Sequence, residues 1–251
     1  MWSGVPFATE HRPWPVPPRP WCIAQSWSDL LFAHWPVHAE VLRPLLPAGL
    51  ELDTRDGVAW LGVVPFRMHG VRLRGLPPVP TTHAFPELNV RTYVTHRGRP
   101  GVWFLSLDAA SRVAVRAARA WFRLPYYDAR MRCDADGDAI RYASLRTHRG
   151  AAPAELRARY APTGAPWLAR AGTLEHWLTE RYCLYAAGPR GLLRGEILHV
   201  PWRLQNAEAE IELNTMARAA GIALPRIAPH LLFVRRIDVV CWAPVAASRD
   251  E

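Results

Sequence analysis

The sequence predicts a single α+β domain in which β-strands dominate and a few short helices flank them. Sixteen glycines and twenty-four prolines among 251 residues favour many turns. Apolar and polar residues alternate along several short segments, a pattern typical of strands. No repeat, low-complexity tract or linker divides the chain, and 50% of its residues are hydrophobic, enough for a sizeable core at this length.

The two ends of the chain differ from the region between them. Residues 1–21 include HRPWPVPPRPW, which favours an extended polyproline II arm. We expect its tryptophans to hold the arm across the domain surface, although the P-x-x-P spacing also suits a ligand of an aromatic groove. The predicted organisation is an arm at 1–21, one β-barrel domain at 22–244 and a tail at 245–251.

Apolar runs bounded by turn residues predict the strands. Asp136-Gly137 is typical of a hairpin turn, and residues 208–212 alternate as in a half-exposed strand. Residues 70–86 carry four prolines and predict a long surface loop. The remaining strands are expected at 22–35, 58–68, 87–95, 102–107, 126–133, 139–147, 183–187, 192–200 and 230–242.

Three short helices are expected. One covers 38–46, a second runs from an N-cap at Ser111 to about Phe122, and a third runs from a cap at Thr173 through Tyr182. The second has an apolar stripe of Val113, Ala117 and Trp121. Its opposite face, which we expect to be solvated, carries Arg112, Arg116, Arg119 and Arg123.

The 31 basic residues are all arginine, and lysine is absent from the chain. This excludes a Schiff-base lysine, a P-loop lysine and every other role of an ε-amine. A net charge of +9 is compatible with nucleic-acid binding. The arginines are not clustered in the sequence, however, so a generally basic surface is expected and nucleic acid is not.

Cysteine usage and hydropathy suggest the compartment. The four cysteines are isolated without zinc-ligand spacing, so we expect reduced, mostly buried thiols and no metal site. No signal peptide and no apolar stretch of membrane-spanning length is evident. The expectation is a soluble, cytoplasmic protein that needs no membrane and no cofactor.

The sequence lacks the motifs of common enzyme classes, but one predicted strand carries a row of polar residues. There is no G-x-S-x-G, H-E-x-x-H, G-x-G-x-x-G or Walker motif, although a triad assembled in space stays open. In the strand 87–95, Glu87, Asn89 and Arg91 share one face. If this face points into a barrel, Arg91 can bind a carboxylate and Glu87 can exchange protons. If it points to solvent, it is an ordinary exposed ladder.

Several segments together resemble the YqjF-like family, a group of uncharacterised bacterial proteins classed as a domain of unknown function. The resemblance runs from about residue 11 to 244, with the blocks in the same order. The segments are HRPWPVPPRPW, SWSDLLFAHWPV, LRPLLPAGLELDT, GVAWLGVVPFRM, FPELNVRTYV, GVWFLSLDAASR, LPYYDARM and LTERYCLY.

The resemblance implies an acetoacetate decarboxylase-like β-barrel that encloses a small-molecule pocket. In those decarboxylases a lysine attacks the substrate ketone, whereas here Tyr126 and Tyr127 stand in the corresponding stretch. Glu87 loosely matches a glutamate that opens a strand in the decarboxylases' pocket. The resemblance also favours an inward Glu87/Asn89/Arg91 face. Tyr126, Asp128 and Arg130 are then candidates on the adjoining strand, and Tyr126 is preferred to Tyr127 because it lies on the more polar face.

Three functions follow as hypotheses. The first is a small-molecule-binding barrel for an anionic or carbonyl ligand, with Asn89, Arg91, Asp128 and Arg130 as binding residues. The second is a non-covalent, lyase-like acid–base enzyme on a small carboxylate, with Glu87 and Tyr126 as the catalytic pair. The third is a polyanion-binding module built on the arginine stripe. The residues do not decide whether the protein is an enzyme. Exposed sheet edges and many tryptophans are compatible with a homodimer.

Overall fold

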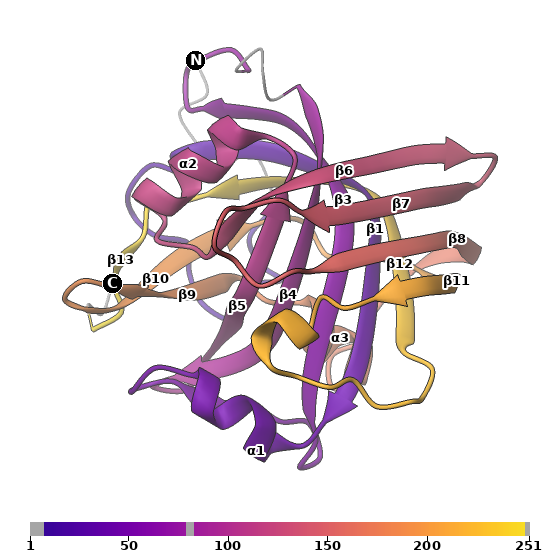
Figure 1. Ribbon diagram of the computed structural model, residues 1–251. Coiled ribbons are helices and arrows are strands. Elements are labelled where there is room, and N and C mark those ends of the chain that lie inside the picture. The colour runs from indigo at the N-terminus through magenta and orange to yellow at the C-terminus, as the bar shows by residue number, and fades with distance from the viewer. Residues whose placement is uncertain (1–7, 79–82, 249–251) are drawn as a thin grey trace.

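A computed structural model describes residues 8–78 and 83–248 of the chain. Its strands join into one sheet (Figure 1). The strands are β1 (Ile23–Val37), β2 (Glu51–Leu52), β3 (Ala59–Leu73), β4 (Ala84–His96), β5 (Arg99–Ala109), β6 (Tyr126–Asp136), β7 (Ala139–Arg146), β8 (Glu155–Leu168), β9 (Cys183–Gly188), β10 (Gly191–Leu198), β11 (Arg203–Asn214), β12 (His230–Cys241) and β13 (Val245–Ala246). The helices are α1 (Ala39–Leu42), α2 (Arg112–Trp121) and α3 (Leu174–Thr179), with 3₁₀ turns η1 (Arg43–Leu45) and η3 (Arg218–Ala220). The predicted β-dominated class with short helices is confirmed.

Strand pairing closes the sheet into two rings that share a wall. Strands β12, β1, β3, β4 and β5 are hydrogen-bonded in that order. The large ring returns from β5 to β12 through β6, β7, β8 and β11, which cross in front of the shared strands in Figure 1. The small ring returns through β9 and β10, because β9 pairs with β5 and β10 pairs with β12.

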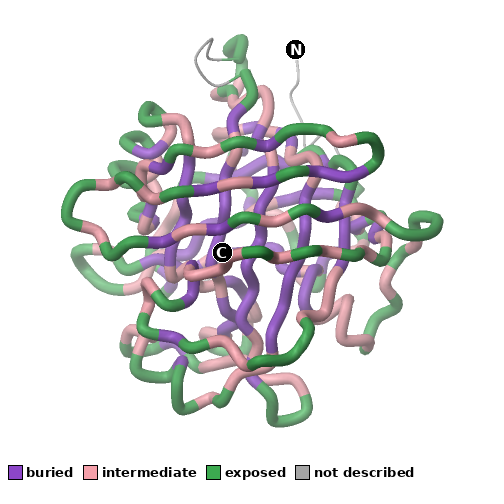
Figure 2. The backbone as a smooth tube through the Cα atoms, turned by 45° about the vertical axis from the view of Figure 1, so that its right-hand side comes forward, coloured by how far each residue is buried: buried purple, intermediate pink, exposed green. Residues whose placement is uncertain are grey.

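The shared strands are buried on both faces in their middle parts, and each face packs into its own core. Leu88 and Val90 of β4 belong to the core of the large ring, whereas Phe85 of the same strand belongs to that of the small ring. Figure 2 shows long buried stretches within the sheet, and the strands of the shared wall carry them, although β12 also exposes Arg235, Arg236 and Asp238. Strand β11 consists mostly of half-buried and exposed residues. Burial on both faces explains why the sequence of β3 is a continuous apolar run rather than an alternating one.

Side-chain caps begin two of the helices as predicted. The Ser111 hydroxyl accepts a hydrogen bond from the Ala114 amide at the start of α2 (3.3 Å), and Thr173 does the same for His176 at the start of α3 (3.3 Å). The predicted end of α3 at Tyr182 is wrong. The helix ends at Thr179, because the backbone leaves helical geometry at Glu180.

The predicted loop at 70–86 is shorter in the structure. Strand β3 continues to Leu73 and β4 begins at Ala84, so the β3–β4 hairpin extends into this segment. Met68 pairs with Phe85 there, and this continued pairing outweighs the turn propensity of the prolines. Residues 79–82 of the predicted loop lie outside the described residues.

Both ends of the chain are tied to the small ring. In the N-terminal arm, Arg12 Nη2 donates to Glu196 Oε2 of β10 at 2.7 Å, and Trp14 Nε1 donates to the same oxygen at 3.0 Å. Within the predicted tail, β13 pairs with Leu193 and Arg194 of β10. The arm therefore crosses the domain with its tryptophan engaged, and part of the tail extends the sheet.

Candidate functional site

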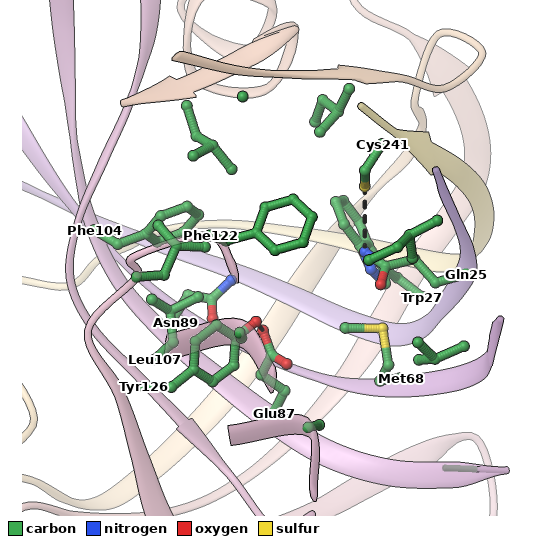
Figure 3. A pocket seen from close by; sticks show the side chains of 18 of the residues that line it. Gln25, Trp27, Met68, Glu87, Asn89, Phe104, Leu107, Phe122, Tyr126 and Cys241 are labelled. Carbon is green, nitrogen blue, oxygen red and sulfur yellow. Dashed lines mark hydrogen bonds between the residues drawn. The ribbon is translucent and has the colours of Figure 1, made fainter. Parts of the chain in front are cut away.

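The small ring encloses a cavity of about 310 Å³. Its wall is mostly apolar, and a few polar side chains enter it from β1, β4, β6 and the segment after α3. Glu87, Asn89 and Tyr126 point into the same space, with Phe104 and Phe122 across from them (Figure 3). The polar row of β4 therefore faces a cavity, not bulk solvent.

Glu87 and Tyr126 form a buried hydrogen-bonded pair. The Tyr126 hydroxyl donates to Glu87 Oε1 at 2.9 Å, and Glu87 is only 2% exposed. Burial raises the pKa of Glu87 to about 8, while the hydrogen bond from Tyr126 acts in the opposite direction. Glu87 is therefore a neutral carboxylic acid at pH 7, able to donate a hydrogen bond or a proton to a ligand.

Tyr126 also stays protonated. Burial is the largest cause that raises the pKa of its phenol well above the ordinary value, and the charge of Glu87 adds to it. At neutral pH the pair thus presents one free donor, the proton of the Glu87 carboxyl, beside the Tyr126 oxygen, which can accept because its own proton is donated to Glu87. A pair of this kind suits a carbonyl or hydroxyl oxygen of a ligand.

Two further buried polar atoms of the pocket lack a partner among the residues that the structure describes. Asn89 is buried, and its Oδ1 accepts no hydrogen bond from the described residues. Trp27 lines the same cavity from β1, and its Nε1 donates to none of them. Buried polar atoms are usually paired in native proteins, so this unpaired acceptor and this unpaired donor are free to bond to a water or a ligand in the cavity.

Arg91 lines the cavity without a carboxylate partner. Its Nη2 makes only long contacts, 3.4 Å to the Tyr93 hydroxyl and 3.5 Å to the Leu178 carbonyl, and its Nε is unpaired. None of the ion pairs within residues 8–78 and 83–248 includes Arg91. The guanidinium lies 5.1 Å from the centre of the Phe32 ring, which fixes it against the wall. A charge held in this way is available to an anion.

A glycine gives Arg91 its room. Gly62 of β3 pairs with Arg91, and a Cβ at that position would lie 3.4 Å from Arg91 Cγ and 3.0 Å from His34 Nε2. His34 shares a 2.6 Å hydrogen bond with the Tyr93 hydroxyl, which in turn faces Arg91. Burial first, then the charge of Arg91, lowers the pKa of His34 well below its ordinary value, so His34 adds no charge here.

Arg181 is a pocket residue that the sequence analysis missed. Its Nε donates to the Trp177 carbonyl at 2.7 Å and its Nη1 to Asp53 Oδ2 at 2.6 Å, while its buried Nη2 has no partner within the described chain. It stacks 4.9 Å from the centre of the Tyr93 ring, which Arg91 also contacts. No local pattern predicts this residue, because it follows the end of α3 and its partner Asp53 is distant in sequence.

The structure brings four of the six predicted site residues to the pocket. These are Glu87, Asn89, Arg91 and Tyr126. The other two, Asp128 and Arg130, do not line it. Asp128 lies beside α2, where Arg116 Nη2 and His148 Nδ1 contact its Oδ2 at 2.8 and 3.0 Å, and Arg130 is exposed.

The choice between the adjacent tyrosines follows the alternation of β6. Tyr126 faces the cavity, whereas Tyr127 points to the other side of the strand. There the Arg146 guanidinium lies 4.2 Å from the centre of the Tyr127 ring, and His148 packs edge-on against it. Tyr127 is thus engaged in a separate cation–π cluster.

Helix α2 forms an open side of the cavity. The predicted apolar stripe of Val113, Ala117 and Trp121 lines the cavity, but Val113 is 55% and Trp121 61% exposed. The residue that α2 buries in the core is Val115. Residues that line a cavity and are also more than half exposed mark the place where it opens to solvent.

The arginine stripe of α2 is partly engaged with its own domain. Arg116 pairs with Asp128, and Arg119 Nη1 donates to the Tyr126 carbonyl at 2.7 Å. These contacts attach α2 to the start of β6, beside the pocket tyrosine. The sequence led us to expect a solvated face. In the structure, part of the stripe instead contacts the domain.

Metal ligands, cysteines and membrane-spanning helices are the remaining features that bear on function. Within residues 8–78 and 83–248, no group of three or more His, Cys, Asp or Glu side chains is placed to hold a metal ion. All four cysteines are unpaired, three of them buried and Cys22 half-buried. None of the helices in the described residues is long and apolar enough to cross a membrane.

The sequence matches a known family over most of its length. Residues 24–238 match DUF2071, a family of uncharacterized conserved proteins. The chain is 48% identical over 227 residues to the uncharacterized protein YqjF of Bacillus subtilis (strain 168), which covers 90% of this chain and 93% of that protein. The resemblance to the YqjF-like family is confirmed.

Solved structures support the fold. Acetoacetate decarboxylase from Legionella pneumophila has a TM-score of 0.62 at 14% identity, covering 95% of this chain and 93% of that one. The enduracididine biosynthesis enzyme MppR in complex with pyruvate has a TM-score of 0.60 at 14% identity, covering 92% and 91%. Identities this low establish the fold alone. The chain belongs to the DUF2071 family and adopts the fold of acetoacetate decarboxylase-like proteins.

Proposed function

We propose that the protein binds an organic carboxylate in the cavity of the small ring. Arg91 holds the carboxylate, and the Glu87–Tyr126 pair, with Asn89, receives a second oxygen function such as a carbonyl or hydroxyl. The observation that carries the proposal is Arg91 itself, a half-buried guanidinium at the cavity wall with no carboxylate partner among the described residues.

The electrostatics of the site favour an anion. Arg91 and Arg181 flank Tyr93, and Asp53 neutralises only Arg181. Glu87 contributes no negative charge at pH 7, because burial raises its pKa to about 8. A carboxylate placed at Arg91 therefore gains a charge-assisted hydrogen bond in a poorly solvated site, where such bonds are strong.

Related structures support the chemical class but not the covalent route. MppR has been solved with pyruvate, and acetoacetate decarboxylase is named for a keto acid. The present chain has no lysine, so no ε-amine is available to form a Schiff base with a ketone. Non-covalent recognition by Arg91 and the Glu87–Tyr126 pair fits this composition.

A binding screen tests the proposal. Purified protein is screened by thermal shift against keto acids, hydroxy acids and aromatic carboxylates, and affinities of the hits are measured by calorimetry. Arg91→Gln should weaken a hit by about 1.5–3 kcal/mol, the range for hydrogen bonds to charged groups. Arg130→Gln is the matched control, because Arg130 is exposed and outside the pocket. Equal affinities for wild type and Arg91→Gln would remove Arg91 from the site.

A second candidate function, acid–base catalysis, is favoured by the pKa of Glu87. A group whose pKa of about 8 lies near the working pH can both give and take a proton. If the protein is a lyase-like enzyme, it should exchange carbon-bound protons of a bound keto acid for deuterium in D₂O, which NMR detects. Glu87→Gln should abolish the exchange while ligand remains bound. Exchange at the same rate in both proteins contradicts this role.

A further inference from the structure

The polar groups of the pocket are separated along β4. Glu87 and Arg91 are four residues apart in a regular strand, and a strand rises about 3.3 Å per residue, so their Cα atoms are roughly 13 Å apart. The side chains do not close this gap. Glu87 is engaged by Tyr126, whereas the Arg91 guanidinium contacts Tyr93 and the Leu178 carbonyl, on the side away from Glu87.

A very short acid is much shorter than the separation of the two ends along β4. An extended chain advances roughly 1.2 Å per bond, so a four-carbon acid spans about 4 Å. The cavity, at about 310 Å³, instead falls in the range of pockets that enclose drug-sized molecules. A ligand that fills a cavity of this size against an apolar wall has a larger apolar part than a four-carbon acid.

The wall of the cavity is suited to hydrocarbon. Aliphatic and aromatic side chains from β1, β3 and β5 line it around the polar row of β4. They include Leu30, Val64, Phe66, Phe104 and Leu107. A ligand that satisfied only the polar atoms would leave these surfaces facing water, which is unfavourable in proportion to their area.

The apolar lining continues to the surface along α2. Val113, Ala117 and Trp121 recur every four residues, so they form one stripe of the helix, and all three line the cavity. Val113 and Trp121 remain more than half exposed. The stripe therefore provides an apolar path from the Glu87–Tyr126 end of the cavity to solvent.

We propose that the ligand is an elongated amphipathic carboxylate, a medium-chain or arylalkyl acid of about eight to twelve carbons, a length that suits the separation of Glu87 and Arg91 along β4 and the apolar lining that continues to α2. Its carboxylate lies at Arg91 and Arg181, its chain follows the wall past Phe104, and its distal end lies against the α2 stripe. An oxygen on the chain meets Glu87 and Tyr126. This inference rests on the proposed function, since it identifies the ligand class of that same pocket.

A chain-length series tests the inference. Binding of butanoate, hexanoate, octanoate and decanoate is measured by calorimetry below their aggregation concentrations. Affinity should rise about fourfold per added CH₂, which corresponds to about 0.8 kcal/mol, and level off once the chain reaches α2. Trp121→Ala should lower the affinity for decanoate severalfold and leave butanoate unchanged. Leu168→Ala is the matched control, because Leu168 is 58% exposed and lies outside the pocket.

The outcomes separate this inference from the proposed function. Equal affinities across the series, with butanoate binding that is lost in Arg91→Gln, overturn the elongated ligand and leave the carboxylate site standing. Decanoate binding that Trp121→Ala does not change also overturns it. Failure of every acid to bind overturns both. Decanamide serves as the neutral probe. If decanamide binds as tightly as decanoate, and Arg91→Gln changes neither affinity, the carboxylate site itself is contradicted.

Discussion

The two rings use the same wall of strands, yet they treat their buried polar groups differently. In the large ring the tyrosine hydroxyls are satisfied by the protein. Tyr142 donates to the Glu87 carbonyl at 2.7 Å, and Tyr160 donates to the Asp29 carbonyl at 2.8 Å. Both residues are almost completely buried. One buried polar atom of this ring, Ser144 Oγ of β7, has no partner among the described residues.

The small ring leaves polar atoms unpaired around a cavity. Asn89 Oδ1, Trp27 Nε1, Arg91 Nε and Arg181 Nη2 are buried and lack partners in the described chain. Because an unpaired buried polar atom is costly, a set of them around one cavity supports the proposal that water or a ligand pairs with them there. The comparison teaches that one face of the shared sheet packs into a core, while the other faces a cavity lined by unpaired polar atoms, which supports the proposed ligand site.

The largest effect is expected from truncating a side chain in the large ring. Tyr142→Ala removes a buried ring and its hydrogen bond to the backbone of Glu87, so it should lower the free energy of unfolding by about 3–5 kcal/mol. Phe104→Ala in the small ring should cost less than half as much, because Phe104 is half-buried and already borders a cavity. Urea denaturation measures both. Similar losses would show that the small ring is packed as tightly as the large one.

The pH dependence of stability tests the buried acid. Native Glu87 keeps its proton up to pH about 8, because burial raises its pKa, whereas the unfolded chain releases it near the ordinary value of 4.5. Stability should therefore fall as pH rises from 4.5 to 8, by on the order of 1.4 kcal/mol per pH unit from this group. In Glu87→Gln, the free energy of unfolding measured across this pH range should lack the dependence that Glu87 contributes.

The exposed Glu208, replaced by Gln, is the control for the pH series, because it lies on the half-exposed strand β11. Glu208→Gln should keep the dependence of the wild type. If Glu87→Gln retains it as well, Glu87 is ionised in the native pocket, and its role as a neutral donor is contradicted.

A smaller effect is expected from Tyr126→Phe. It removes one hydrogen bond to Glu87 and should change stability by about 1 kcal/mol. Because that bond opposes the raised pKa of Glu87, its loss should move the titration of Glu87 further up. Carbon-13 NMR of the labelled glutamate carboxyl measures the titration. An unchanged or lower midpoint would mean that Tyr126 does not bond to Glu87 in solution.

Sequence alone predicted much of the fold, since turns and apolar runs locate most of the strands and Ser111 and Thr173 locate two helix starts. Strand β8 was not predicted. It did not decide where the Glu87/Asn89/Arg91 face points. Periodicity separates the two faces of a strand but does not say what covers each, and β4 is covered on both.

The same limit applies to α2 and to the missed arginine. The apolar stripe with Val113 and Trp121 is visible in the sequence, but its position beside an open cavity depends on tertiary structure. Arg181 is recognisable only after folding brings Asp53 and Tyr93 to it. Asp128 shares the alternation of Tyr126, yet Arg116 of α2 draws it into a contact outside the pocket.

The most direct test is NMR of the arginine Nε–H groups during titration with octanoate. The Arg91 signal is assigned by its loss in Arg91→Gln. Arg146, whose side chain is bonded to the buried Asp108 at 2.6 Å, provides an internal reference within the same protein. The account predicts that saturating octanoate shifts the Arg91 resonance and leaves the Arg146 resonance in place. An Arg91 resonance that does not move while octanoate binds would contradict the assignment of the small ring as a carboxylate site.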